Sequence, residues 1–456
     1  MSLDNALEAA QAGRDESLAE LVEELRIPSI STLPEHRDDC RRNANWLVDR
    51  FEALGFETEL VDVRDGGHPV LRADWMQRPG APVLTIYGHY DVQPADPLDE
   101  WDSDPFDPQV HDDVLVARGC ADNKGNHMAT LRAVTAWMQA GGPPVNVRFL
   151  IEGEEEIGGH SLPEYLRANA SDLATDCVLL WDGGFSTDDS PALTSGLRGM
   201  LYVEIETSGA VRDLHSGFGG AAPNPAMTLA RILASLKDSD EHITVPGFYD
   251  DVRDPDPDEV ARWHRSSDEE LKSLFGVDEL VGEEGFGLDE RMWVRPTLEV
   301  NGIVGGFTGT GMKTVIGAKA LAKVSMRLVP DQDPDAILAA LDKYVTSMST
   351  PGVRASVTKL EAAPPVLCGY DHAGAKAAAK AFEEAFGRPA VLVRSGGSVP
   401  VATAFNEAVD APMVISGIAT KDCGAHGPNE RLYLANYFGG IEMVVRFLQG
   451  FADASR

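Results

Sequence analysis

The chain has 456 residues, of which 73 are acidic and 39 basic, so its formal net charge is −34. This charge argues against nucleic acid or an anionic membrane surface as a partner, because both bind through clustered lysine and arginine. The length, together with 43% hydrophobic residues, predicts two folded domains rather than a disordered chain.

The amino-terminal segment, residues 1–25, has the pattern of one acidic amphipathic helix and not of a signal peptide. No apolar run of the sequence approaches the roughly 20 residues that a membrane span needs. The five cysteines lack CxxC spacing, which is typical of reduced thiols. We therefore expect a cytoplasmic protein without a membrane partner.

Residues 38–192 alternate between helical and extended patterns. This alternation predicts an α/β fold, in which helices cover a mostly parallel sheet. In such sheets ligands bind beyond the carboxyl ends of the strands. Helical spacing covers residues 39–55 and 126–142, and short β-rich runs cover residues 57–63, 82–88, 145–153 and 177–183.

After Gly196 the pattern changes to that of a smaller α+β domain with a charged, loop-rich segment, residues 238–295, that we expect to be a solvated flap. From residue 372 onward the α/β pattern returns. The sequence therefore predicts a discontinuous α/β domain interrupted by an inserted α+β domain, with boundaries at 1–195 plus 362–456 and at 196–361.

Several polar residues follow the predicted strands. His89 and Asp91 point the same way from one strand, so the carboxylate of Asp91 can orient an imidazole that faces a metal. Asp122 lies in a glycine-flanked turn that opens a helix, where it is either a helix cap or a carboxylate that bridges two cations. Asp182 and His426 each fit turn chemistry as well as metal ligation.

The stretch IEGEEEIGGH, residues 151–160, places four carboxylates in five positions after an apolar strand. Their mutual repulsion would be offset by a bound cation. Spacing alone leaves open which glutamate of residues 154–156 is a ligand and which is a general base. The whole set suits two Zn²⁺ ions that share a bridging carboxylate: His89, Asp122, one of these glutamates, Asp182 and His426.

Five clusters in this order, GHYDVQP, ARGCADNKG, EGEEEIGG, WDGG and AHGPNE, resemble the metal-site motifs of the dizinc peptidase family that includes carboxypeptidase G, aminoacylase and the carnosinases. The segments RDLHSGFGG, PTLEVNGIVGGFTGTGMKTVI, RLVPDQDP and RSGGSVPV resemble the branch of the carnosinases and cytosolic nonspecific dipeptidases. The resemblance spans nearly the whole chain. It implies a dizinc catalytic domain with an inserted lid and dimerisation domain.

The resemblance also implies the ligands of the two zinc ions. His89 and Asp182 would bind one ion, Glu156 and His426 the other, and Asp122 would bridge them.

Further features of the metal site are expected as well. Glu155 would be the general base, and Asp91 would orient His89. The peptide bond between Asp122 and Asn123 would be cis. Glu152 and Glu154 would either support the ligands or face solvent.

Substrate contacts are implied in both domains. His215 would reach the active site of the other subunit and stabilise the oxyanion there, which implies a homodimer. Ser395 stands where the branch often carries an acidic residue, so recognition of the substrate's amino end is expected to differ. The residues implied to grip the peptide's carboxylate and backbone are Thr314, Arg327, Ser395, Gly396, Gly397 and Ser398.

These patterns predict a homodimeric dipeptidase with two Zn²⁺ ions per subunit, for which Mn²⁺ or Co²⁺ are possible substitutes. An N-acyl or N-succinyl amino acid deacylase would use the same metal site, and an inactive peptide- or metal-binding relative is the third possibility. A dipeptidase must recognise a free amine, whereas a deacylase must recognise an acyl group.

Overall fold

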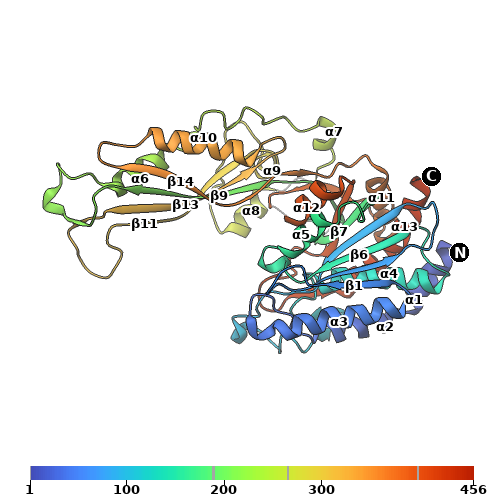
Figure 1. Cartoon of the computed structure of the whole chain (residues 1–456). Coiled ribbons are helices and arrows are strands. Elements are labelled where there is room, and N and C mark those ends of the chain that lie inside the picture. The colour runs from blue at the N-terminus through green and yellow to red at the C-terminus, as the bar shows by residue number, and fades with distance from the viewer. Residues whose placement is uncertain (1, 187–189, 264–266, 398–399, 456) are drawn as a thin grey trace.

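The computed structural model describes residues 2–186, 190–263, 267–397 and 400–455 and has two lobes (Figure 1). A long, narrow lobe built on antiparallel strands extends from a larger lobe, in which helices surround a sheet. Both ends of the chain lie on the larger lobe.

The larger lobe is built on a nine-stranded sheet in the order β1-β2-β6-β3-β7-β17-β8-β15, and β16 also pairs with β8. The pairs β3–β6, β3–β7, β7–β17 and β8–β16 are parallel, and the others are antiparallel. The predicted α/β fold class is confirmed. The strands are β1 (Glu57–Val61), β2 (Val70–Trp75), β3 (Val83–His89), β6 (Asn146–Glu152), β7 (Cys177–Gly184), β8 (Ala192–Leu197), β15 (Val366–Leu367), β16 (Val391–Ser395) and β17 (Met413–Ala419).

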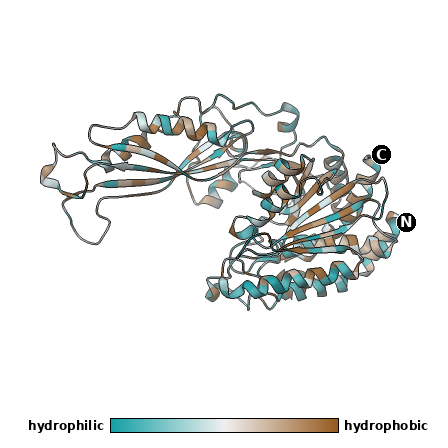
Figure 2. Ribbon diagram, viewed as in Figure 1, coloured by the Kyte–Doolittle hydropathy of each residue, from teal (hydrophilic) through white to brown (hydrophobic). Residues whose placement is uncertain are grey.

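Helices cover both faces of this sheet. Successive residues of a strand point to opposite sides, so apolar side chains on both faces need a covering layer. In β7, Leu179 and Trp181 join the core beneath α1 to α4, α11 and α13, whereas Val178 and Leu180 join the core beneath α5 and α12. Figure 2 shows apolar residues concentrated along the strands. The helices are α1 (Leu3–Ala12), α2 (Arg14–Leu25), α3 (Arg37–Ala53), α4 (Lys124–Gln139), α5 (Ser161–Ala168), α11 (Ala373–Phe386), α12 (Pro400–Val409) and α13 (Leu434–Ala454).

The expectation of one helix over residues 1–25 is wrong, because α1 ends before Gly13 and α2 begins after it. Short elements complete this lobe. A small sheet in the order β18-β5-β4 joins β4 (Gln109–His111), β5 (Val114–Val116) and β18 (Arg431–Tyr433), and two 3-10 helices cover Pro34–His36 and Leu98–Glu100.

The smaller lobe contains a four-stranded antiparallel sheet in the order β11-β13-β9-β14, with α6 and α10 packed on it. Residues of β9 alternate strictly between buried and partly buried positions, as expected for a sheet with one covered face. A two-stranded sheet, β10–β12, lies beyond it. The elements are β9 (Gly199–Ser208), β10 (Leu214–His215), α6 (Pro225–Ala234), β11 (Thr297–Gly305), β12 (Val315–Ile316), β13 (Lys319–Leu328), α10 (Pro334–Ser347) and β14 (Arg354–Ala363), with a 3-10 helix at Ser216–Phe218.

The charged segment 238–295, called here the acidic insertion, carries three short helices, α7 (Pro257–Val260), α8 (Asp268–Phe275) and α9 (Leu288–Trp293). The expectation of a solvated flap is wrong for much of it. Phe248 is buried in the core of the smaller lobe, and Trp263 is buried in the core of the larger lobe. The predicted domain boundaries stay a prediction. Within the described residues, no helix is long and apolar enough to cross a bilayer.

Candidate active site

The three central strands β6, β3 and β7 end at one edge of the large sheet, and each delivers polar residues there. His89 is the last residue of β3, and Asp182 lies near the end of β7. Glu155 and Glu156 open a 3-10 helix, Glu155–Ile157, soon after β6. The parallel arrangement of these strands thus brings together, at their carboxyl ends, residues that are far apart in the sequence.

One group of donor atoms joins His89, Asp122 and Asp182. The Nε2 atom of His89 lies 3.2 Å from Oδ1 of Asp122 and 3.5 Å from Oδ1 of Asp182. The side-chain amide of Asn123 donates to the carboxylate of Asp182 and, at 3.0 Å, to the carbonyl oxygen of Trp181. The Asp122–Asn123 peptide bond is cis, as the family resemblance implied.

A second group joins Asp122, Glu156 and His426. The Nε2 atom of His426 lies 3.0 Å from Oδ2 of Asp122 and 3.3 Å from Oε2 of Glu156. The two oxygens of Asp122 therefore face different donor groups, which is the geometry of a bridging carboxylate. Gln93 donates to Oε2 of Glu156 at 2.8 Å and fixes this ligand candidate from outside.

Asp91 connects β3 to the acidic turn after β6. The Nδ1 atom of His89 lies 3.0 Å from the carbonyl oxygen of Asp91 and 3.3 Å from its carboxylate, so Nε2 is directed toward the donor groups. The carboxylate of Asp91 also accepts the backbone N–H groups of Glu155 at 3.3 Å and Glu156 at 3.1 Å.

The electrostatics of the site fit bound cations. Burial, opposed by the charge of His89 and reinforced by neighbouring carboxylates, raises the pKa of Glu155 to about 8. Burial and the charge of Asp122 raise the pKa of Glu156 to about 7. The Oε1 atom of Glu156 is buried and has no hydrogen-bond partner among the residues that the structure describes. Two divalent cations would satisfy this oxygen and offset the repulsion among the carboxylates.

The other acids of the IEGEEEIGGH stretch lie apart from both donor groups. Glu154 is buried and accepts the backbone N–H groups of His68 and Ser161, each at 2.8 Å. Glu152 is buried and accepts the hydroxyl of Tyr87 at 3.0 Å. The alternative that Glu152 and Glu154 face solvent is therefore wrong.

Glu430 was not singled out by the sequence, although it ends the AHGPNE cluster. Its fully buried carboxylate accepts Arg118 Nη1 and the backbone N–H groups of Gly119 and Ala121, each at 2.8 Å, and that of Asp122 at 3.0 Å. It thereby holds the loop that presents Asp122. A single acid after a glycine-rich loop carries no periodic or spacing signal that would reveal this role.

The residues predicted to contact the substrate are not members of the two donor groups. His215 is exposed on β10 and Thr314 directly precedes β12, whereas Arg327 lies on β13. Ser395 ends β16, Gly396 and Gly397 follow it, and the Oγ atom of Ser395 accepts the N–H of Gly397 at 3.1 Å. Ser398 lies outside the described residues.

Two carboxylate-imidazole groups that share one aspartate, at the carboxyl ends of an α/β sheet, define a dinuclear metal-dependent hydrolase. Residues 85–450 match the model of peptidase family M20/M25/M40. The chain belongs to this family, as the sequence motifs predicted.

Relatives extend the similarity over the whole chain. The Cys-Gly metallodipeptidase dug1 of Schizosaccharomyces pombe is 31% identical over 100% of this chain and 99% of its own length. The human Beta-Ala-His dipeptidase is 31% identical over 95% of this chain and 90% of its own length. The structure of the dipeptidase Dug1p from Saccharomyces cerevisiae matches with a TM-score of 0.82 and 27% identity, covering 100% of this chain and 99% of that one.

Proposed function

We propose that this protein is a metal-dependent dipeptidase that hydrolyses the amide bond of dipeptides. The observation that carries the proposal is the pair of donor groups that share Asp122, with the carboxyl group of Glu155 beside them. Relatives named as dipeptidases, similar over nine tenths or more of both chains, support the substrate class.

The residues that would hold the cations are His89, Asp122, Glu156, Asp182 and His426. Two Zn²⁺ ions per subunit fit this set of imidazoles and carboxylates, and Mn²⁺ or Co²⁺ would be substitutes. When bound, such cations polarise the scissile carbonyl and lower the pKa of water toward about 7.

Glu155 is the residue that we propose to move the proton. Its carboxylate would take a proton from the attacking water and release it to the nitrogen of the leaving amine. The raised pKa of Glu155, about 8, lies close to neutral pH. A carboxyl group with such a pKa can both accept and release a proton during the reaction. Bound cations oppose that rise, because they favour the charged carboxylate.

His215 would complete the site from a second subunit. It follows β9, whose ten residues span about 30 Å from the junction of the two lobes. At the far end of the lobe, the N–H of Ser216, next to His215, donates to the carbonyl oxygen of Thr314 at 3.0 Å. Because β9 carries His215 away from the larger lobe, the site that it serves would belong to the partner.

The substrate's carboxylate would be bound by residues at the near end of the smaller lobe. Arg327 pairs with Met200 across the β9–β13 ladder, close to the junction, and a guanidinium forms bidentate bonds with a carboxylate. The Ser395–Gly397 segment would contact the peptide backbone, together with Ser398. We also propose a cytoplasmic location, which the five free, buried cysteines support.

The test is hydrolysis by the protein before and after metal removal. We expect chelation to abolish cleavage of Ala-Ala, Cys-Gly or carnosine, and Zn²⁺ or Mn²⁺ to restore it. Metal analysis is expected to give about two ions per subunit, one for each donor group. Activity that survives exhaustive chelation would contradict the proposal.

A substrate panel separates the alternatives. Preference for N-acetyl or N-succinyl amino acids over dipeptides would indicate a deacylase on the same metal site. A metal-loaded protein that cleaves none of these substrates would indicate an inactive binding relative.

A further inference from the structure

The acidic insertion, residues 238–295, is fastened to the large sheet beside the Ser395–Gly397 segment. Trp263, only 6% exposed, forms an isolated bridge with Leu392 of β16, and the N–H of Leu392 donates to the carbonyl oxygen of Arg262 at 3.4 Å. Trp293 of the same insertion packs edge-on against Trp263, with ring centroids 5.4 Å apart. The insertion thus reaches from the smaller lobe into the core of the larger one.

Glu259 makes the polar contact at this point. Its side chain is 5% exposed and accepts Nε and Nη2 of Arg394, each at 2.7 Å, and the hydroxyl of Ser195 at 2.6 Å. Ser195 lies on β8 and Arg394 on the neighbouring strand β16, where the register shifts between Val393 and Arg394. One carboxylate from the insertion therefore fixes two strands where their regular pairing is interrupted.

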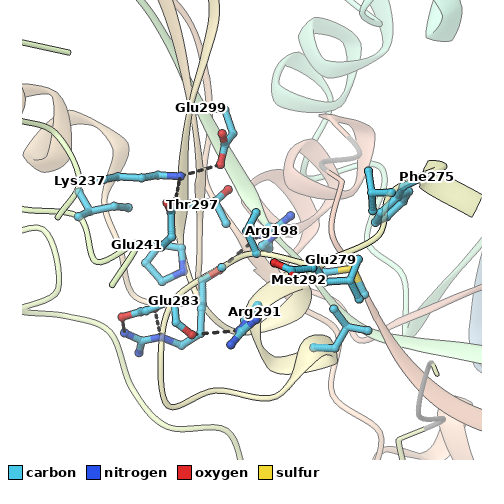
Figure 3. Close-up of a pocket in the computed structure, with 18 residues that line it drawn as sticks. Arg198, Lys237, Glu241, Phe275, Glu279, Glu283, Arg291, Met292, Thr297 and Glu299 are labelled. Carbon is cyan, nitrogen blue, oxygen red and sulfur yellow. Dashed lines mark hydrogen bonds and ion pairs between the residues drawn. The ribbon is translucent and has the colours of Figure 1, made fainter. Parts of the chain in front are cut away.

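The residues after Arg394 are linked to the insertion through Arg198. Arg198 donates through Nε to the carbonyl oxygen of Gly396 at 3.0 Å and through Nη1 to that of Arg295 at 3.4 Å. A Cβ atom on Gly396 would lie 3.0 Å from Arg198 Nη2 and 3.2 Å from the carbonyl oxygen of Met292. Figure 3 shows Arg198 and Met292 among the side chains that line a cavity of about 350 Å³ between the insertion and β11.

We propose that Glu259 is a positioning residue of the active site: through Arg394 it fixes the backbone of Ser395–Gly397, so the acidic insertion supports substrate binding. Arg198 binds the carbonyl oxygen of Gly396, and Ser395, the first residue of the segment, directly follows Arg394. A bidentate carboxylate-guanidinium pair has a defined geometry, so loss of the carboxylate frees the arginine and the backbone attached to it. The inference rests on the proposed function, because that function assigns substrate contact to Ser395–Gly397.

The effect of Glu259 should appear in substrate binding more than in chemistry. Glu259→Gln keeps the size of the side chain but removes the charge that pairs with Arg394. We expect KM for a dipeptide to rise about tenfold, with kcat within about twofold and metal content unchanged, because uniform binding is lost while the metal site is intact. The milder variant Ser195→Ala leaves the ion pair in place and should raise KM less.

A double-mutant cycle tests whether Glu259 acts through Arg394. Glu259→Gln, Arg394→Lys and the double variant are compared in the full-length protein. We expect the double variant to show the KM of the worse single variant, because both changes break one contact. Asp74→Asn is the matched control, since Asp74 pairs with Arg148 at 2.8 Å near the opposite edge of the same sheet. That control should lower the unfolding temperature without changing KM.

Hydrogen exchange gives a readout that does not depend on activity. Amides in peptides covering residues 390–397 should exchange at least about tenfold faster in Glu259→Gln than in the unmodified protein, and no faster in Asp74→Asn. Unchanged exchange there, or a wild-type KM in a folded Glu259→Gln enzyme, would overturn the inference. If the unmodified protein cleaves no dipeptide, the proposed function fails, and the exchange result still decides whether Glu259 fixes this segment.

Discussion

At the scale of single residues, the four acids that follow β6 have separate environments although they are near neighbours in sequence. Glu154 is bound by two backbone N–H groups and Glu152 by a tyrosine hydroxyl. Glu156 belongs to a donor group, and Glu155 is half-buried beside it. Spacing alone left open whether Glu154 or Glu155 is the general base, and the buried hydrogen bonds of Glu154 support the proposal that it is Glu155.

Separate replacement of Glu155 and of its neighbour Glu154 tests which residue moves the proton. Glu155→Gln should lower kcat by about 10²–10⁴-fold with two metal ions retained, because a general base contributes this much to the rate. Glu154→Gln is the control. An amide has one acceptor oxygen, so one buried N–H group loses its partner and the free energy of unfolding falls by about 1–3 kcal/mol.

The readouts are kcat, metal content and thermal unfolding of both variants. If Glu154→Gln abolished turnover with metals retained while Glu155→Gln did not, the general base would be Glu154. The sequence could indicate that a metal site lies here, because carboxylates crowded after an apolar strand need a positive charge. It could not indicate Glu430, whose partners come from a loop about 310 residues away.

At the scale of elements, the central strands and long helices were predictable because each has a clear periodicity. Strand β3 and helices α3 and α4 lie within a few residues of their predicted bounds. The short helices α7 to α9 were not predicted, because they lie in a charged segment whose apolar residues are few. Their docking depends on Trp263 and Glu259, whose partners belong to another part of the chain.

Strand pairing next to the metal ligands leaves no space for a side chain at Gly417 on β17. A Cβ atom there would lie 2.0 Å from the carbonyl oxygen of Gly183 and 2.8 Å from Oδ1 of Asn126. Asn126 in turn donates to the carbonyl oxygen of Ala121, next to Asp122. Gly417→Ala should therefore lower the free energy of unfolding by about 1–3 kcal/mol and weaken metal retention, because the strands and the Asp122 loop must shift.

Urea unfolding and competition with a zinc chelator measure the two effects. Gly450→Ala on α13 is the matched control, since the nearest atom to a Cβ atom there is the Cβ atom of Ala377 at 3.4 Å, an ordinary van der Waals distance. If the Gly417→Ala protein were as stable as the unmodified protein and retained its metal equally well, β7 and β17 could move apart at this point without cost, and the prediction would be wrong.

At the scale of the whole molecule, the smaller lobe exposes an apolar edge. β11 is an edge strand, and its Val300, Ile303 and Val304 are exposed, Ile303 by 67%. Long edge strands with exposed apolar residues are sites for pairing with another chain. This surface supports the proposed homodimer, in which a second copy of the chain covers β11.

Dimerisation and catalysis should therefore be lost together. Ile303→Lys is expected to convert the dimer to a monomer in light scattering and to lower kcat strongly, because His215 of a partner is then missing. Leu98→Lys changes a similarly exposed leucine on the larger lobe and should do neither.

Co-expression of two inactive variants adds a direct test of the shared site. Dimers that combine His215→Ala with Glu155→Gln contain one intact site, so a random mixture should recover about a quarter of wild-type activity in a symmetric dimer. A mixture as inactive as its parents would show that His215 does not act across the dimer.

The smaller lobe leaves and re-enters the large sheet at a single place. Leu197 pairs with Val366 in β8–β15, and Met200 pairs with Ala363 in β9–β14, so both crossings form one two-stranded ribbon. A module attached in this way costs the sheet little closure entropy whatever its size, because its two ends already lie together. The antiparallel sheet of the smaller lobe can therefore be lengthened or exchanged while the metal ligands keep their places, as long as the contacts of Trp263 and Glu259 with the larger lobe are kept. Such an arrangement lets one hydrolytic centre acquire new substrates by changing what is grafted onto the ribbon.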